Sequence, residues 1–185
     1  DFNTEQKSAK ANQSNRKTEP EILAMVKEQI DDFAAHHDGV VTDLVNFKPA
    51  GGEITPLRTA CKHGYLSIVK FLAEEFGADV NLANHKNHSP IIYAAFYGHL
   101  EIVQYLLSFS ENVTEGLQRE EVDLSLVDAT GFNVLYWAVQ GYKRSVVAFQ
   151  SALPLKKENV AERQKNCERQ QKIIVRLLIK LFEVT

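Results

Sequence analysis

Apolar residues in the middle of the chain recur at the spacing of helix faces. Leu57, Ala60, Cys61 and Gly64 lie at positions i, i+3, i+4 and i+7, which places them on one face of a helix. The same order of residue types returns 34 positions later, beginning at Ile91. A period of this size predicts stacked supersecondary units, because a single unit cannot bury its hydrophobic face alone.

Each copy reads as two helices joined by a short turn. A hydroxyl residue before a proline, Thr55-Pro56 in one copy and Ser89-Pro90 in the next, predicts a helix start with a capped first turn. A glycine eight residues after the proline ends the first helix. An Ile-Val-x-x-Leu pattern then marks a second helix in both copies. The pattern therefore predicts an all-α fold.

A third copy is less regular. Residues 122–139 repeat the pattern at a spacing of 44, which predicts an insertion near residues 108–121. Tyr142 stands where the glycine ends the first helix in the other copies. We expect a second helix to follow, with Val146 and Val147 in the place of the Ile-Val pair.

The two ends of the chain do not follow the repeat. Residues 1–18 are polar and predict a disordered lead-in, because they cannot bury enough apolar surface to order themselves. Residues 19–52 predict short helices that form either an N-terminal cap or a degenerate repeat. The repeats occupy residues 53–153. Residues 154–185 predict one long helix, either a C-terminal cap or part of a fourth repeat.

The two clear copies resemble the ankyrin repeat. Its pattern, TPLHxAAxxGHxxIVxLLLxxGADVN, is matched at most positions of residues 55–81 and 89–107. The resemblance implies an ankyrin-repeat solenoid of stacked helix-turn-helix units, here with a long C-terminal helix. It also implies that partners bind to the concave side formed by the first helices and to the fingertip turns between repeats.

The face of each first helix opposite the repeated apolar face carries large aromatic residues. Such residues on an exposed row are typical of protein interfaces. The alternative is that the N-terminal segment, the insertion or the C-terminal helix folds over them. The candidate partner-binding residues are Thr59, Lys62, His63, Tyr93, Phe96, Tyr97, Tyr136, Trp137 and Gln140 on the helices, and His85, Lys86, His88 and Phe132 on the turns.

The composition is that of a soluble globular protein, with 44% apolar and 24% charged residues among 185. No apolar stretch is long enough to predict a membrane span. The net charge of −3 is uneven, because residues 154–185 carry eight basic and four acidic side chains. A solvated helix face explains that basic end, so nucleic acid is not the expected partner. The low number of cysteines favours a reducing, cytoplasmic location.

Candidate chemistry is sparse. His85-x-x-His88 and the pair His36-His37 have no cysteines or carboxylates beside them in a zinc-binding pattern, so no metal site is expected. Phosphate-binding glycine loops, nucleophile elbows and HExxH motifs are missing from the sequence, and we expect no cofactor and no catalytic residues. Cys61 occupies a core position and is expected to be inert.

The sequence therefore predicts a monomeric, non-catalytic protein–protein interaction module. The alternative is a targeting or regulatory ankyrin fragment of a larger multidomain enzyme. A bacterial effector that acts in the cytosol of a host cell is one form of that alternative.

Overall fold

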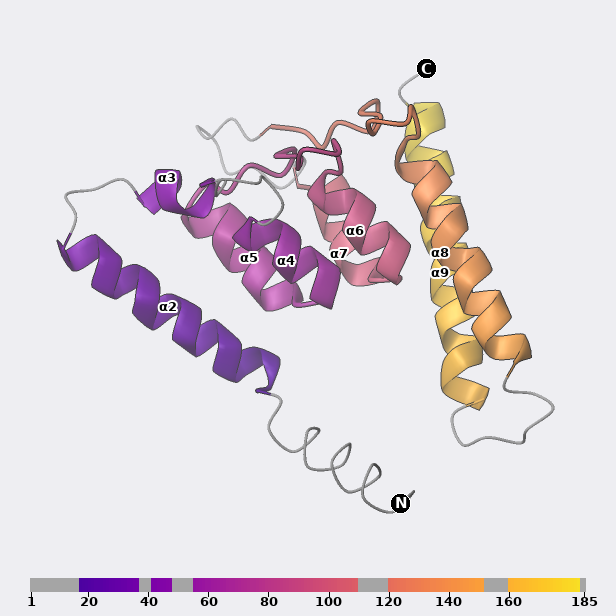
Figure 1. Cartoon of the computed structure of the whole chain (residues 1–185), viewed down its shortest axis with the longest axis horizontal. Coiled ribbons are helices and arrows are strands. Elements are labelled where there is room, and N and C mark those ends of the chain that lie inside the picture. The colour runs from indigo at the N-terminus through magenta and orange to yellow at the C-terminus, as the bar shows by residue number, and fades with distance from the viewer. Residues whose placement is uncertain (1–16, 37–40, 48–54, 110–119, 152–159, 184–185) are drawn as a thin grey trace, which may run out of the picture. The chain divides into compact units, whose positions relative to one another are not determined.

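The computed structural model describes residues 17–36, 41–47, 55–109, 120–151 and 160–183. All regular secondary structure within these ranges is α-helical, so the predicted all-α class is confirmed (Figure 1). Most of the lead-in, most of the insertion and the pair His36-His37 lie outside the residues or side chains that can be described. No described helix is long and apolar enough to cross a membrane.

The chain divides into two compact units, residues 1–41 and residues 42–185. The first unit contributes helix α2 (Glu19–His36). The backbone amide and the hydroxyl of Thr18 both donate to the carboxylate of Glu21, at 2.6 and 2.9 Å. These hydrogen bonds, the backbone one first, lower the pKa of Glu21. Helix α2 begins directly after Thr18, and the bond from the Thr18 amide to a carboxylate three residues on is typical of a capped helix start.

The second unit is a stack of helix pairs (Figure 1). Inner helices α4, α6 and α8 contact one another in that order, and outer helices α5, α7 and α9 do the same behind them. A short helix, α3, precedes the stack. The bounds are α3 (Val41–Val45), α4 (Pro56–His63), α5 (Leu66–Glu75), α6 (Pro90–Tyr97), α7 (Leu100–Leu107), α8 (Val134–Gln150) and α9 (Val160–Glu183).

The repeated apolar residues form the core of the stack. Leu57 and Cys61 on α4, and Ile91 and Ala95 on α6, are 1% exposed or less. Thr55 caps α4, because its hydroxyl accepts a hydrogen bond from the backbone amide of Arg58. The predicted helix faces and the helix starts at Pro56 and Pro90 are therefore confirmed, whereas the side chain of Ser89 makes no capping hydrogen bond.

Two side chains bond an outer helix to the inner helix of the preceding unit: His99 directly precedes α7, and Gln170 lies in the middle of α9. The Nε2 atom of His99 lies 3.0 Å from the Lys62 carbonyl oxygen, and the Nε2 atom of Gln170 donates to the Phe96 carbonyl at 3.0 Å. Lys62 and Phe96 are equivalent residues, 34 positions apart. Burial lowers the pKa of His99, so its ring is neutral at pH 7, and the nitrogen that faces the carbonyl must be the donor.

Glycines leave the space that these two side chains need. A Cβ atom on Gly64 would lie 2.6 Å from Nδ1 of His99, and one on Gly98 would lie 2.9 Å from Nε2 of Gln170. Gly141 lies against the Phe96 carbonyl and the same amide of Gln170. Each glycine is therefore required by the close approach of a neighbouring unit.

The prediction that a second helix of the third unit contains Val146 and Val147 is wrong. Helix α8 continues without a break from Val134 to Gln150, and Val147 is 65% exposed. Gly64 and Gly98 end the other inner helices in the left-handed conformation. Tyr142 replaces that glycine, and because a tyrosine rarely adopts this conformation, the helix does not end there.

Helix α9 takes the place of the missing outer helix. Ile173 and Leu177 are 0% exposed and repeat the four-residue spacing of Ile102 and Leu106. Gln170 lies three residues before Ile173, as His99 lies three residues before Ile102. We infer that α9 is the outer helix of the third unit rather than a cap or a fourth repeat.

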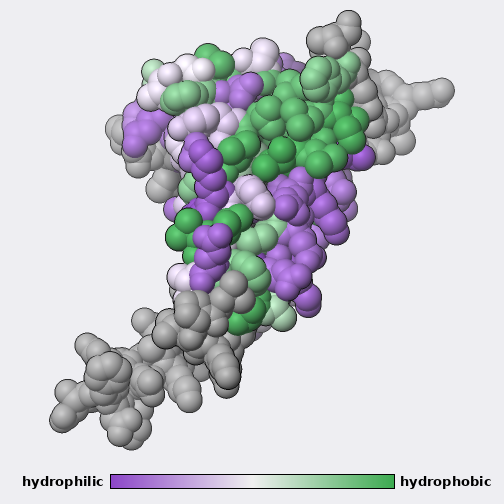
Figure 2. All heavy atoms as spheres, turned by 90° about the vertical axis from the view of Figure 1, so that its right-hand side faces the viewer, coloured by the Kyte–Doolittle hydropathy of each residue, from purple (hydrophilic) through white to green (hydrophobic). Residues whose placement is uncertain are grey.

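The third helix pair is longer than the other two. Its extra turns are joined by hydrogen bonds from Arg163 to the Ala148 carbonyl (2.6 Å) and from Asn166 to the Ser145 hydroxyl (3.0 Å). Figure 2 shows this end of the stack, with apolar side chains gathered over one half and hydrophilic ones over the other. The exposed large apolar residues of α9 are Val175, Ile179 and Phe182.

The segment that contains α3 forms a hydrogen bond to the next unit that is equivalent to one between two later units. The Oδ1 atom of Asn46 accepts a hydrogen bond from the Asp79 amide at 2.8 Å. One unit later, Oδ1 of Asn81 accepts from the Asp123 amide at 2.9 Å. This equivalence favours a degenerate repeat over an unrelated cap before Thr55.

Gln170 offers a direct test of the register of α9. Gln170→Ala removes the donor to the buried Phe96 carbonyl and should lower the free energy of unfolding by about 1–3 kcal/mol. Gln164→Ala, on the exposed part of the same helix, should change it by less than about 0.5 kcal/mol. Urea denaturation of both variants makes the comparison, and equal effects would refute the proposed role of α9.

The two cysteines test the packing of α4. Burial raises the pKa of the Cys61 thiol, which is 0% exposed, whereas Cys167 is half-buried on α9. A native-state thiol assay should label Cys167 roughly 5,000-fold faster, because Cys61 can react only after global unfolding that costs about 5 kcal/mol. In Cys167→Ser the fast phase should disappear. A fast phase that persists in this variant would show that Cys61 is accessible.

Candidate partner-binding site

The inner helices and the turn before α6 enclose a hollow of about 460 Å³, which we call the inner hollow. Its walls come from α4, α6, the first turn of α8 and residues 84–88. Nine of the residues selected from the sequence meet there: Thr59, Lys62, His63, Lys86, His88, Tyr93, Phe96, Tyr97 and Trp137.

Four selected residues do not line the hollow. His85 is exposed at the tip of the turn, and Gln140 is half-buried on α8. Phe132 and Tyr136 stack on each other with ring centroids 3.8 Å apart. This stacked pair lies beside the hollow, because Tyr136 also contacts Trp137 edge to face.

The aromatic rings of the hollow contact one another edge to face. Phe96 lies 5.8 Å from Trp137 and 5.1 Å from Tyr97 between ring centroids, and the His88 ring lies 4.8 Å from Trp137. Tyr93 adjoins His88 at 6.0 Å. Edge-to-face contacts add to the stability of such a cluster. All five rings remain half-buried, so the cluster presents one continuous surface to the hollow.

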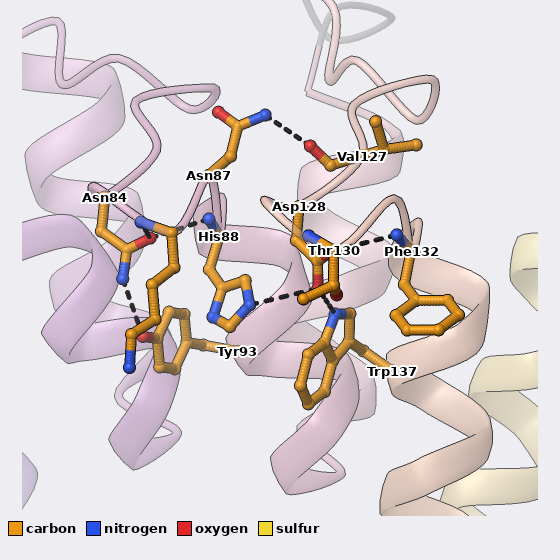
Figure 3. Close-up of polar contacts among 10 residues, drawn as sticks. Asn84, Asn87, His88, Tyr93, Val127, Asp128, Thr130, Phe132 and Trp137 are labelled. Carbon is orange, nitrogen blue, oxygen red and sulfur yellow. Dashed lines mark hydrogen bonds and ion pairs between the residues drawn. The ribbon is translucent and has the colours of Figure 1, made fainter.

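Asn84 connects the first fingertip turn to the hollow. Its Oδ1 atom accepts hydrogen bonds from the backbone amides of Lys86 and His88, at 3.0 and 2.8 Å. Its Nδ2 atom lies 3.4 Å from the hydroxyl of Tyr93, to which it donates (Figure 3). The side chain thus closes the turn and orients an aromatic ring.

Asp128 does the same in the next unit, 44 residues later. Its Oδ1 atom accepts from the backbone amides of Thr130 (2.8 Å) and Phe132 (3.0 Å). Its Oδ2 atom accepts from the indole Nε1 of Trp137 at 2.8 Å and lies 3.4 Å from Nε2 of His88. Two rings of the hollow therefore converge on one carboxylate (Figure 3).

The carboxylate of Asp128 is ionised although it is buried. Burial raises its pKa, but the hydrogen bonds from Thr130, Phe132 and Trp137 outweigh that effect and hold the pKa far below its usual range. Its side chain is only 2% exposed. The charge of Asp128 therefore acts on the neighbouring donors, among them the Trp137 indole, and it is not exposed to a ligand.

The two fingertip turns are also joined to each other. The Ala129 amide donates to the Lys86 carbonyl at 2.9 Å, and the side-chain amide of Asn87 donates to the Val127 carbonyl (Figure 3). Asn87 has φ of 59°, as expected for a position that glycine usually holds. The rim of the hollow is thereby fixed by backbone contacts.

Two arginines lie against the aromatic rings. The guanidinium of Arg58 is 5.4 Å from the centroid of the Tyr93 ring, and that of Arg144 is 5.6 Å from both Phe96 and Tyr97. Arg58 is buried and lines the hollow, whereas Arg144 is exposed on α8. Cations at this range are attracted to the faces of aromatic rings.

The sequence selection missed four lining or supporting residues: Arg58, Asn84, Ile92 and Asp128. One available signal was the recurrence of Asn or Asp nine residues before an aromatic residue, as in Asn84 and Tyr93. Arg58 carried no such signal.

Helix α9 does not cover the inner hollow. It contacts α7 and α8, and none of the residues that line the hollow belong to it. The alternative that the C-terminal helix folds over the aromatic row therefore does not hold for residues 160–183. No group of three or more His, Cys, Asp or Glu side chains that could hold a metal occurs within the described ranges.

A family model of ankyrin repeats in three copies matches residues 32–116. The match begins within α2 and includes α3, and it ends before the third helix pair. It therefore supports a degenerate repeat before Thr55. The third helix pair lies outside the matched residues.

Curated proteins with similar sequences also carry such repeats. A probable E3 ubiquitin-protein ligase of Oryza sativa subsp. japonica is 42% identical over 71 residues, which are 38% of this chain and 14% of that protein. A Notch-regulated ankyrin repeat-containing protein of Homo sapiens is 39% identical over 71 residues, 38% of this chain and 60% of that protein.

An ankyrin repeat and KH domain-containing protein of Caenorhabditis elegans is 32% identical over 129 residues, 66% of this chain and 4% of that protein. The chain thus spans only a small part of several of these relatives. The stacked helix pairs, the matching family model and these similarities agree that residues 32–116 of this chain are ankyrin repeats.

Proposed function

We propose that this chain binds another protein through the inner hollow and the neighbouring fingertip turns. Ankyrin repeats are generally non-catalytic modules for protein–protein interaction. The observation that carries the proposal is the row of half-buried rings on the inner helices, Tyr93, Phe96, Tyr97 and Trp137. The stack itself does not require them, because the core residues lie on the opposite faces of the same helices.

The hydrogen bonds behind the rings support this proposal. Asn84 and Asp128 hold Tyr93 and Trp137 in place from the buried side. A ring that is already ordered loses little conformational entropy when a partner binds, so more of the contact energy appears as affinity. Tyrosine and tryptophan are also the residues that most often dominate binding energy at interfaces.

We also propose that the chain acts as a monomer in a reducing, cytoplasmic environment. Cys61 and Cys167 are both free.

A second proposal is that the repeats are the targeting part of a larger multidomain enzyme. The observation in its favour is that the similar region makes up 14% of a probable E3 ubiquitin-protein ligase. Determination of the complete reading frame tests it: a catalytic domain in the same polypeptide would support the proposal, and a reading frame that encodes only the repeats would refute it.

Tyr97→Ala is the sharpest test of the aromatic row. It removes a half-buried ring of the hollow and should weaken partner binding by about 2 kcal/mol or more, as expected for an aromatic anchor. The matched control is Tyr105→Ala, which removes a half-buried ring from the outer helix α7.

Parallel affinity capture from cell extract by the wild type and both variants provides the measurement. Partners should be retained by Tyr105→Ala and lost by Tyr97→Ala, while urea denaturation shows similar stability for the two variants. Equal retention by both would place the partner site away from the inner hollow.

Asp128→Asn tests the support behind the rings. The pKa of Asp128 is depressed in the folded state, so its stabilising effect is present above the unfolded pKa of about 4 and is lost as the pH falls below that value. The variant should be less stable than the wild type by about 2 kcal/mol at pH 7, because a hydrogen bond to a charged group is lost.

The difference should shrink as the pH falls below about 5, because the carboxylate becomes protonated in the unfolded chain while it stays ionised in the folded protein. Asp123→Asn is the control, because Asp123 accepts hydrogen bonds from Ser125 in a similar turn but is exposed. Urea denaturation at several pH values measures both variants. A constant difference between wild type and Asp128→Asn would contradict the assignment.

A further inference from the structure

We infer that the partner segment that enters the inner hollow is an acidic peptide segment, with carboxylate side chains next to an apolar or aromatic residue. This inference rests on the proposed function, because it names the chemistry of the partner at the same site. It follows from the charges that surround the aromatic rings.

The lining of the hollow is cationic although the protein is acidic. Residues 51–153 contain eleven acidic and seven basic side chains, yet none of the eleven acidic ones lines the hollow. Three of the seven basic ones do, namely Arg58, Lys62 and Lys86. A fourth, Arg144, lies against Phe96 and Tyr97. The positive groups are therefore concentrated where the aromatic rings are.

The positions of these groups suit a segment with apolar and acidic side chains in sequence. Lys62 and His63 form the last turn of α4 on one side of the rings, and Lys86 lies on the fingertip turn. An apolar side chain that covers Phe96 would place its neighbours close to these cations. Complementary charges of this kind mainly raise the association rate and the selectivity, and their effect weakens with salt.

Asp128 does not reverse this charge. It lies behind His88 and Trp137, and its two oxygens accept hydrogen bonds from Thr130, Phe132 and Trp137. With 2% of its side chain exposed, it offers no carboxylate surface to an entering ligand.

A single-stranded nucleic acid also combines negative charge with groups that stack on aromatic rings. The charge of the whole chain disfavours it, since nucleic-acid affinity depends on many phosphate contacts and the net charge is −3. An acidic peptide needs only the few cations that the hollow provides.

The probe for the test is a random twelve-residue peptide library displayed on phage and selected on the immobilised chain. The enriched peptides should contain Asp or Glu beside Phe, Tyr, Trp or Leu. A synthetic copy of the most enriched peptide, labelled with a fluorophore, is then measured by fluorescence anisotropy against the wild type and the variants.

Lys62→Glu combined with Lys86→Glu should weaken this peptide about tenfold or more, since two attractive contacts become repulsive. The control, Lys143→Glu combined with Lys172→Glu, changes the net charge equally on exposed residues outside the hollow and should alter the affinity less than about twofold. If circular dichroism shows that the first double variant is unfolded, Lys62→Gln combined with Lys86→Gln replaces it, and a loss of about threefold or more is then expected.

Three results would overturn the inference, and they separate it from the proposed function. Enriched peptides that are neutral or basic but lose binding with Tyr97→Ala would leave the hollow as the partner site and refute its acidic preference. Tighter binding of a twelve-residue oligothymidylate than of the peptide would assign the hollow to nucleic acid. Failure to select any peptide that depends on Tyr97 would refute the proposed function and the inference together.

Discussion

A side-chain donor from the outer helix of one unit reaches a carbonyl in the last turn of the preceding inner helix, and the order of the stack depends on this contact. Carbonyls at helix ends have no partner within the helix, so a buried one needs a donor from elsewhere. His99 meets this need for Lys62, and Gln170 meets it for Phe96. The contact works only where glycine leaves room, which explains why Gly64 and Gly98 recur at equivalent positions.

This contact also positions the candidate site. Because it fixes the distance between successive inner helices, side chains at equivalent positions of α4, α6 and α8 form a continuous surface around the hollow. The fingertip turns add a second level of order, since Asn84 and Asp128 use the same geometry to hold Tyr93 and Trp137. The repeated geometry therefore determines where the rings lie. It does not determine which residue type occupies each of these positions.

The division between repeated and variable residues follows from where each side chain lies. Leu57 and Ile91 are repeated because they occupy the same packed space in successive units, and their loss would open a cavity. Lys62 and Phe96 occupy equivalent positions that face the hollow, and packing does not constrain them to be alike. The similarity to other ankyrin repeat proteins therefore identifies the fold, whereas we propose that residues such as these select the partner.

Local and periodic features could be read from the sequence. The helix starts at Pro56 and Pro90, the burial of Cys61 and the positive φ of Asn87 each depend on a few neighbouring residues or on the repeat period. Nine of the thirteen candidate residues that were selected from the repeat pattern line one hollow in the structure.

Other features depend on contacts between distant parts of the chain. Gln170 and Phe96 are 74 residues apart, so no local pattern revealed that α9 replaces the outer helix expected at Val146. Asp128 looked like an ordinary turn residue, and only the fold brought His88 within 3.4 Å of its carboxylate. The sequence by itself thus determined the helices of the two regular repeats and the faces they bury, because these follow from short-range sterics and periodicity. The tertiary structure alone decided which helices pair and which charges meet at the hollow, because those contacts exist only after distant segments have packed together.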